Sequence, residues 1–251
     1  MKAFQKKIWK YYRAHGRDLP WRHTKNPYHI LVSEIMLQQT QVSRVLVKYK
    51  EFLRHFPTLH ALSQSSITDV LKVWQGMGYN RRALALHRLA RSTSTIPRKF
   101  DVLVDLPGIG PYTAGAIMVF AFNKPVAMIE TNIRRVFIHE FLSPSDSPLS
   151  IRGRAEGVGD EQILKLVTAT LDHKNPREWY YALMDYGAML AKTVPNPNRR
   201  SKHYTKQSKF EGSHRQLRGE VLRLLLAKKP LPSGSKVKMI KKELHREGFV
   251  L

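Results

Sequence analysis

Cysteine is absent from all 251 residues of the sequence. Its absence excludes disulfides, cysteine-ligated zinc and cysteine-bound iron–sulfur clusters. The eleven histidines are scattered, with no pair at metal-ligand spacing beside a carboxylate. We therefore expect no metal site and no cofactor.

Acidic residues and long apolar runs are both scarce. The chain has 19 Asp and Glu against 43 Lys and Arg, a formal net charge of +24 with a sequence pI near 10.4. This excess favours a polyanion as partner, because neutralising phosphates releases their counterions. A basic membrane-surface protein is the competing interpretation, but no apolar stretch approaches the ~20 residues of a membrane span. The N-terminus also lacks the apolar core of a signal peptide, so we expect a cytoplasmic protein.

Helical spacing of apolar residues dominates the chain. Leu31, Ile35, Val42 and Val45 lie on one stripe, which is interrupted near Thr40. Strand alternation holds nowhere for long and no internal repeat is visible, so the fold class is predicted to be all-α. Further helices are expected over residues 3–15, 81–92, 131–142, 160–171, 176–190, 216–226 and 236–247.

The most specific stretch is the string LPGIGPYTA at residues 106–114. Gly108 and Gly110 allow backbone geometry that a β-carbon would resist, and Pro111 suits the first turn of a helix. We expect a tight hairpin between two helices, whose N-terminal amides hold a phosphate. An ordinary helical turn is the plainer alternative.

The full string resembles the hairpin of the helix-hairpin-helix DNA glycosylases, with a catalytic acid about twenty positions on. Glu130 stands at that distance from Gly110. The resemblance implies a two-lobed core over residues 1–192. A six-helix lobe of about residues 27–130 would lie inside a second lobe formed by the N-terminus and residues 131–192.

The remaining residues, 193–251, form a basic C-terminal segment. Residues 192–251 hold 16 Lys and Arg against 4 Asp and Glu, half of the net charge of the chain. Two amphipathic helices and a short apolar end suggest a helical, winged-helix-like extension. We expect it to bind phosphates.

A glutamate among apolar neighbours, Glu34 in VSEIMLQQT (residues 32–40), carries a second resemblance. An arbitrary glutamate in a helix belongs on a solvated face, but this string is similar to the catalytic motif of the MutY-type adenine DNA glycosylases. The similarity runs from about residue 19 to 190. It implies that Glu34 is the general acid, that Leu37 lines the base pocket, and that Gln39 intercalates where the base has left the stack. Gln38 and Thr40, on either side of Gln39, are expected to contact DNA as well. Burial would raise the pKa of such a glutamate and keep its proton available.

Other pocket residues follow from the same resemblance. Trp21 and Arg22 match residues that contact the flipped adenine, and Asp185 matches an acid that reaches the base. Capping, or pairing with an arginine, is an equally good account of Asp185. Tyr112 matches a tyrosine that hydrogen-bonds near the catalytic glutamate. Related bifunctional enzymes carry a lysine there, which forms a Schiff base, so we expect a monofunctional enzyme that leaves an abasic site.

The sequence departs from the family pattern in four places. Glu130 replaces an aspartate, which shifts the carboxylate by roughly 1.5 Å. The four cluster-binding cysteines are replaced by a basic stretch, and the last ~40 residues are too few for the family's separate domain that recognises 8-oxoguanine. A turn that usually ends in two tyrosines reads Tyr79-Asn80.

The expected partner is therefore double-stranded DNA with a mismatched or damaged base, bound by a monomer at the nucleoid. Adenine opposite guanine or 8-oxoguanine is the first candidate substrate. A mismatch-specific thymine/uracil glycosylase of the same superfamily is the alternative, and a non-catalytic DNA-binding module is the third. Further DNA contacts are expected at Tyr79, Asn80, Arg81, Gly108, Gly110, Thr113, Arg199, Arg200, Lys202, Lys206 and Lys209.

Overall fold

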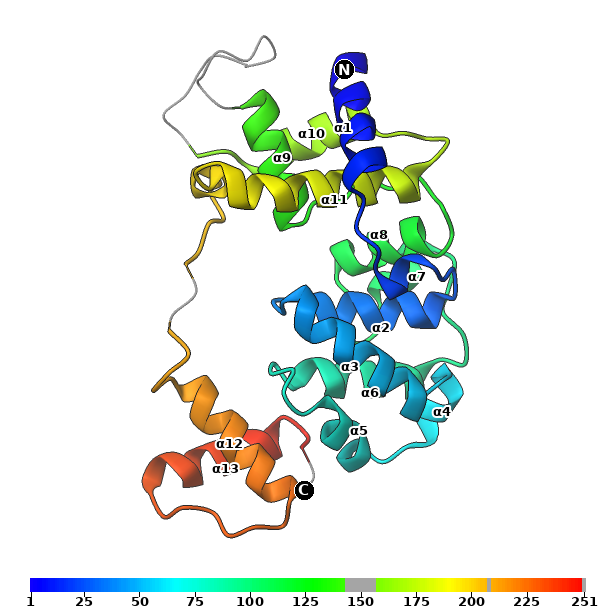
Figure 1. Ribbon diagram of the computed structural model, residues 1–251. Coiled ribbons are helices and arrows are strands. Elements are labelled where there is room, and N and C mark those ends of the chain that lie inside the picture. The colour runs from blue at the N-terminus through cyan, green and yellow to red at the C-terminus, as the bar shows by residue number, and fades with distance from the viewer. Residues whose placement is uncertain (143–156, 207–208, 250–251) are drawn as a thin grey trace. The chain divides into compact units, whose positions relative to one another are not determined.

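The computed structural model describes residues 1–142, 157–206 and 209–249 (Figure 1). Its contacts divide the chain into two compact units. The first comprises Met1–Lys25 and Gly110–Lys206, and the second Asn26–Ile109 and Gln207–Leu251. The chain passes between the units three times, after Lys25, within the hairpin of residues 106–114 and after Lys206.

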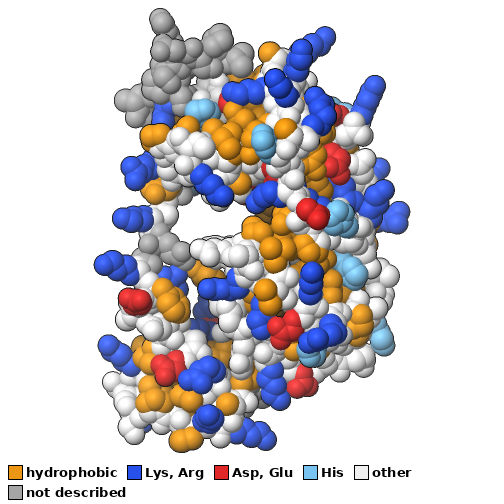
Figure 2. Space-filling model, viewed as in Figure 1, with side chains coloured by type: hydrophobic (Ala, Val, Ile, Leu, Met, Phe, Trp, Pro, Cys, Tyr) orange, Lys and Arg blue, Asp and Glu red, His pale blue; other side chains and the backbone are white. Residues whose placement is uncertain are grey.

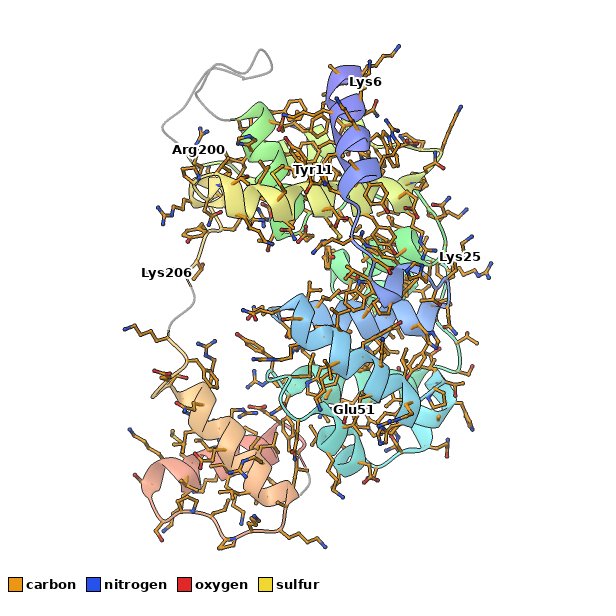
Figure 3. The ribbon with its side chains drawn as sticks, in the orientation of Figure 1. Lys6, Tyr11, Lys25, Glu51, Arg200 and Lys206 are labelled. Atoms are coloured by element: carbon orange, nitrogen blue, oxygen red, sulfur yellow. The ribbon has the colours of Figure 1, made fainter. Side chains whose placement is uncertain are left out.

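The first unit is built on helix α11 (Pro176–Thr193), against which α1 (Lys2–His15) and α9 (Thr131–Phe141) pack (Figure 1). An aromatic cluster joins them: the Phe4 ring lies 4.9 Å from Phe141 and 6.0 Å from Trp179, centroid to centroid. Tyr11 extends from α1 over α11 (Figure 3), where its ring meets Tyr186 edge-on at 5.3 Å. The unit also contains η1 (Pro20–Arg22), α8 (Pro111–Phe120), α10 (Asp160–Thr170) and η2 (Pro197–Arg200).

The second unit surrounds α2 (Pro27–Leu37), whose residues 30–36 are all buried. Asn26 begins this helix, because its side chain accepts the amide of Tyr28 at 2.9 Å. Pro27 follows at the first helical position. The other helices of this unit are α3 (Val42–His55), α4 (Leu59–Gln64), α5 (Ile67–Trp74), α6 (Arg81–Ser92), α7 (Phe100–Val104), α12 (His214–Leu226) and α13 (Ser235–Arg246).

The all-α prediction is confirmed: the described residues form helices and no strand, apart from one isolated bridge between Val158 and Ser201. Between residues 209 and 249 there are two helices and no wing of strands. The contact division differs from the expected one in three places. It groups residues 110–130 and residues 193–206 with the terminal helices, and residues 207–251 with the central ones.

In the part of the chain that the structure describes, no helix combines the length and hydropathy needed to cross a bilayer. The described residues also contain no group of three or more His, Asp or Glu that could hold a metal ion.

Candidate active site

Glu34 lies on the third turn of α2 with 6% of its surface exposed. It is buried because α2 is apolar on nearly every face and is surrounded by its unit. Leu37 ends the helix half-buried, and the chain then turns at Gln39, an exposed residue with a φ of 51°. A left-handed backbone at a residue other than glycine costs energy, and such residues cluster at functional sites. The loop after Glu34 is therefore strained at the residue expected to intercalate.

A second left-handed turn precedes α6. Gly76 and Gly78 have φ values of 84° and 67°, and Tyr79 follows with a φ of 47°. Tyr79 keeps 38% of its surface exposed. Asn80 then occupies the N-cap position of α6 without a capping hydrogen bond from its side chain. This turn presents an aromatic ring at the surface of the unit.

Arg82 joins these two turns, and the sequence analysis did not single it out. Its guanidinium lies 2.9 Å from the Met36 carbonyl and 3.0 Å from the Thr40 hydroxyl. It also faces the rings of Trp74 and Tyr79 at about 5.5 Å. The full set of its acceptors from the two turns is the carbonyls of Ile35, Met36, Gln38, Met77, Gly78 and Tyr79 and the hydroxyl of Thr40.

The acceptors of Arg82 are thus neutral, and burial lowers its pKa to about 10. The sequence did contain an indication that Arg82 has acceptors within the fold. An arginine in the first turn of a helix faces the positive end of the helix dipole, so it needs acceptors elsewhere. Arg82 finds them at the end of the helix that carries Glu34.

The hairpin has different requirements at its two glycines. Gly108 has a φ of 78°, and a β-carbon there would lie 2.6 Å from that of Ala85, so only glycine fits. Gly110 has an ordinary extended backbone, with nothing within 4 Å of a β-carbon. The expectation of restricted geometry is therefore correct for Gly108 and wrong for Gly110. The open space beside Gly110, at the uncapped N-terminus of α8, leaves room for a phosphate.

Pro111, Tyr112 and Thr113 form the first turn of α8. Tyr112 is half-buried and Thr113 is 3% exposed. Thr113 is therefore almost completely covered within its unit.

Glu130 is the N-cap of α9, and its carboxylate folds back onto the first turn of that helix. Oε1 accepts the amides of Asn132 at 2.7 Å and Ile133 at 2.9 Å, and Oε2 accepts the Asn132 side-chain amide at 3.2 Å. Burial raises the pKa of Glu130, although the hydrogen bonds and the charge of Arg135 oppose this. The longer side chain is thus accommodated by a capping geometry with neutral donors.

Asp185, unlike Glu130, has positively charged hydrogen-bond donors. It is 2% exposed on α11, and both oxygens accept from Arg22, at 2.8 and 2.7 Å, and from Arg17, at 2.8 and 2.6 Å. Burial alone would raise the pKa of Asp185, but the two arginines lower it. Pairing with an arginine, one of its two expected roles, is what the structure contains.

Two other pocket candidates lie near this ion pair. The Arg22 guanidinium stacks over the ring of Tyr181, 4.5 Å from its centroid. Trp21 precedes Arg22 in η1 and is 4% exposed. Arg22 is therefore occupied by its own unit, and Trp21 is largely covered.

Some of the residues expected to bind phosphates are paired within the fold, and others are exposed. Lys and Arg side chains are spread over the face shown in Figure 2 and far outnumber Asp and Glu. Arg200 donates to the carbonyl of Leu142 and so holds η2 near the end of α9 (Figure 3). Arg81 forms an ion pair with Glu247, at 2.8 Å from its Nε. Of the expected residues, Arg199, Lys202, Lys206 and Lys209 are exposed and form no ion pair with any described residue.

The structure therefore collects the predicted residues into two sets. In the second unit, Arg82 gathers the loop after Glu34 and the turn at Tyr79. In the first unit, Asp185 is joined to Arg22, while Glu130 is held separately at the start of α9. Tyr112 belongs to this unit as well.

Comparison with known proteins places these features in a family. Residues 32–158 match the model of the HhH-GPD superfamily base excision DNA repair proteins. An adenine DNA glycosylase of Mycobacterium tuberculosis (strain CDC 1551 / Oshkosh) is 36% identical over 248 residues, covering 86% of this chain and 76% of that protein. One from Buchnera aphidicola subsp. Baizongia pistaciae is 34% identical over 207 residues, covering 78% of this chain and 55% of its own length. The solved structure of a thermostable thymine-DNA glycosylase superposes with a TM-score of 0.66 at 28% identity, covering 80% of this chain and 92% of that one.

Proposed function

Because the chain belongs to the HhH-GPD superfamily of base excision DNA repair proteins, we propose that this DNA glycosylase removes adenine from a mismatch with guanine or 8-oxoguanine. The observation that carries the proposal is the burial of Glu34 on α2, directly before a strained loop. A protein that only binds DNA has no use for a carboxylate at an apolar position, because its burial is costly.

The proposed reaction is hydrolysis of the N-glycosidic bond. Glu34 donates its proton to the adenine ring while the bond between base and sugar breaks, and the electron pair of that bond leaves with the base. The sugar becomes positively charged, and the Glu130 carboxylate stabilises it. Water then adds to the sugar and returns a proton to Glu34. The products are free adenine and an abasic site.

Strand cleavage is not part of the proposal, because Tyr112 has no amine with which to form a Schiff base. The wild type should leave intact strands that break only after alkali or heat. Borohydride trapping of a protein–DNA adduct, with strand cleavage before alkali treatment, would contradict this point.

The decisive experiment is a panel of end-labelled duplexes with adenine, thymine or uracil opposite each normal base and 8-oxoguanine, assayed for alkali-labile sites. We expect release of adenine, and Glu34→Gln should abolish it while duplex binding persists, because the amide keeps the shape but cannot donate the proton. The matched control is Glu51→Gln, in the same unit (Figure 3), where the glutamate pairs with Lys48 at 2.9 Å. Base release by Glu34→Gln within a few-fold of wild type would remove Glu34 from the acid role.

A thymine or uracil substrate is the second candidate, favoured by the 28% identity and 0.66 TM-score to the thymine-DNA glycosylase. The same panel separates the two, because thymine or uracil opposite guanine would then be the processed duplex. Both candidates imply action at chromosomal DNA within the cytoplasm, and we propose that the enzyme acts as a monomer.

Phosphate binding by the exposed cations can be tested separately. Neutralising Arg199, Lys202, Lys206 and Lys209 together should weaken binding to damaged and undamaged duplexes alike. Each lost contact should remove roughly 0.9 from the slope of log affinity against log salt. Arg200 is left intact, because it donates to Leu142 within the fold. An unchanged slope would show that these cations do not contact phosphates.

A further inference from the structure

The C-terminal helices α12 and α13 form a small apolar pair within the second unit (Figure 1). Val221 and Leu222 of α12 and Ile240 and Leu244 of α13 are each at most 3% exposed. Helix α12 also packs against α5. The helical pair, residues 209–249, therefore has buried apolar side chains and packs on its unit, in addition to carrying cations that could bind phosphates.

Glu247, directly after α13, attaches the helical pair to α6. Its carboxylate accepts from both Arg81 of α6 and Arg218 of α12, and its carbonyl accepts from Arg88 of α6 at 2.9 Å. The Glu247 side chain is 17% exposed. One residue thus binds three arginines from two helices.

The next two residues complete the attachment. Gly248 has a φ of 91°, and a β-carbon there would lie 2.4 Å from the Arg88 guanidinium. Phe249 is 2% exposed, and Arg218 lies over its ring at 5.6 Å. The close approach and the buried ring fix the register of α13 against α6.

This attachment brings α12 to the turn that carries Tyr79. Arg215 donates from Nη1 to the Tyr79 hydroxyl at 3.0 Å. The face of the same ring lies 5.4 Å from the Arg82 guanidinium. Tyr79 is thus held at its hydroxyl by the helical pair and at its ring by α6, and these two contacts fix the orientation of an exposed aromatic side chain.

We propose that the helical pair is a positioning element for Tyr79, with Arg215 as the positioning residue. An exposed ring in a strongly basic protein is a stacking surface for a DNA base. Because Arg82 also holds the loop after Glu34, the base on Tyr79 is one close to the excised nucleotide. A ring of fixed orientation discriminates between bases that a freely rotating ring would accept equally, so Arg215 sets the preference for the opposite base. This inference rests on the proposed function.

The test compares Arg215→Ala with Arg223→Ala, which removes an exposed arginine about two turns further along the same helix. The readout is single-turnover base release from duplexes that differ only in the opposite base. We expect Arg215→Ala to reduce the ratio between preferred and disfavoured opposite bases by about fivefold, the effect of one net hydrogen bond. Arg223→Ala should leave the ratio unchanged.

Two further variants test whether Arg215 affects the ratio through Tyr79 and the attachment at Glu247. Tyr79→Phe removes the acceptor and should reproduce the fall in the ratio, with no further fall in the double variant with Arg215→Ala. Glu247→Gln should lower the ratio as well, because it loosens the attachment. Additive losses in the double variant, or an Arg215→Ala variant that merely weakens binding to every duplex, would overturn the proposal.

A second measurement does not depend on catalysis. A duplex with 2-aminopurine opposite the target position reports the stacking of that base by its fluorescence. In the bound complex, Arg215→Ala should shift the signal toward that of Tyr79→Ala, whereas Arg223→Ala should match the wild type. An unshifted signal would overturn the positioning role. Absence of base release by the wild type, with these shifts intact, would contradict only the proposed function.

Discussion

Glu130 and Asp185 are both acidic residues of the first unit, but their partners differ in charge. Asp185 accepts from two arginines, and its pKa is lowered. Glu130 accepts from neutral amides, and burial raises its pKa. A carboxylate already neutralised by arginines has little charge to offer a developing cation, whereas one held by amides keeps that charge available. We therefore propose that Asp185 serves the fold and that Glu130 serves the chemistry.

The largest expected effect is that of Glu130→Gln on base release. The glutamine oxygen can still accept the amides of α9, but it carries no charge to stabilise the sugar cation. We expect the single-turnover rate to fall by about 10³-fold, with little change in the thermal midpoint. A single-turnover rate close to that of wild type would contradict the catalytic role proposed for Glu130.

The next effect concerns stability. Asp185→Asn leaves Arg17 and Arg22 beside a neutral amide, and breaking a buried pair of this kind costs about 3 kcal/mol of unfolding free energy. Urea unfolding followed by circular dichroism measures it. The control is Glu161→Gln, whose pair with Lys165 is largely exposed and should contribute nothing measurable. A folded, fully stable Asp185→Asn that has lost only base release would assign Asp185 to the base pocket instead.

Glu130→Asp keeps the charge at this position and tests whether the placement of the carboxylate matters. Aspartate is a good N-cap, so the helix should remain stable. Its carboxylate would, however, sit roughly 1.5 Å from the native position, and we expect base release to fall by about a hundredfold. A rate equal to or above wild type would mean that the native glutamate is a weakened substitute for the shorter acid.

The smallest effects should appear in the pH dependence of unfolding. Because the pKa of Asp185 is lowered on folding, its contribution is complete above its ordinary pKa and is lost as pH falls through the lowered value. The stability gap between wild type and Asp185→Asn should therefore narrow below about pH 4. The pKa of Glu130 is raised, so its ionisation costs stability. Glu130→Gln should gain on wild type as pH rises from about 4.5 through the raised pKa. Urea titrations from pH 2.5 to 7.5 measure both, and equal slopes would contradict the opposite shifts.

Local patterns predicted the helices well. The apolar stripe of α1 and the N-caps of α2 and α9 are properties of neighbouring residues, so the sequence contains them directly. The hairpin shows the limit of such patterns. Gly108 and Gly110 look alike in the string, yet only Gly108 is required, because Ala85 of α6 packs against it. That contact is distant in sequence.

Among the candidate site residues, the roles of Asp185 and Arg81 depended on partners that no local pattern supplies. Arg22 lies 163 positions from Asp185, and Glu247 lies 166 positions from Arg81. Both arginines were expected to contact substrate or DNA, and each is engaged within its own unit. Arg82 was missed for the same reason, since four of its seven acceptors lie at the end of α2 and in the loop that follows, more than forty positions away.

The sequence by itself determined the helical class, the basic surface, the hairpin and the catalytic-type string around Glu34, because composition and short-range spacing encode them. Only the tertiary structure decided which charged side chains are paired with other groups within the fold. Asp185, Arg81 and Arg200 are engaged with partners that are distant in the sequence. The physical reason is that the charge state of an ionisable group depends on burial and on every group packed around it, and packing joins residues that the sequence keeps apart.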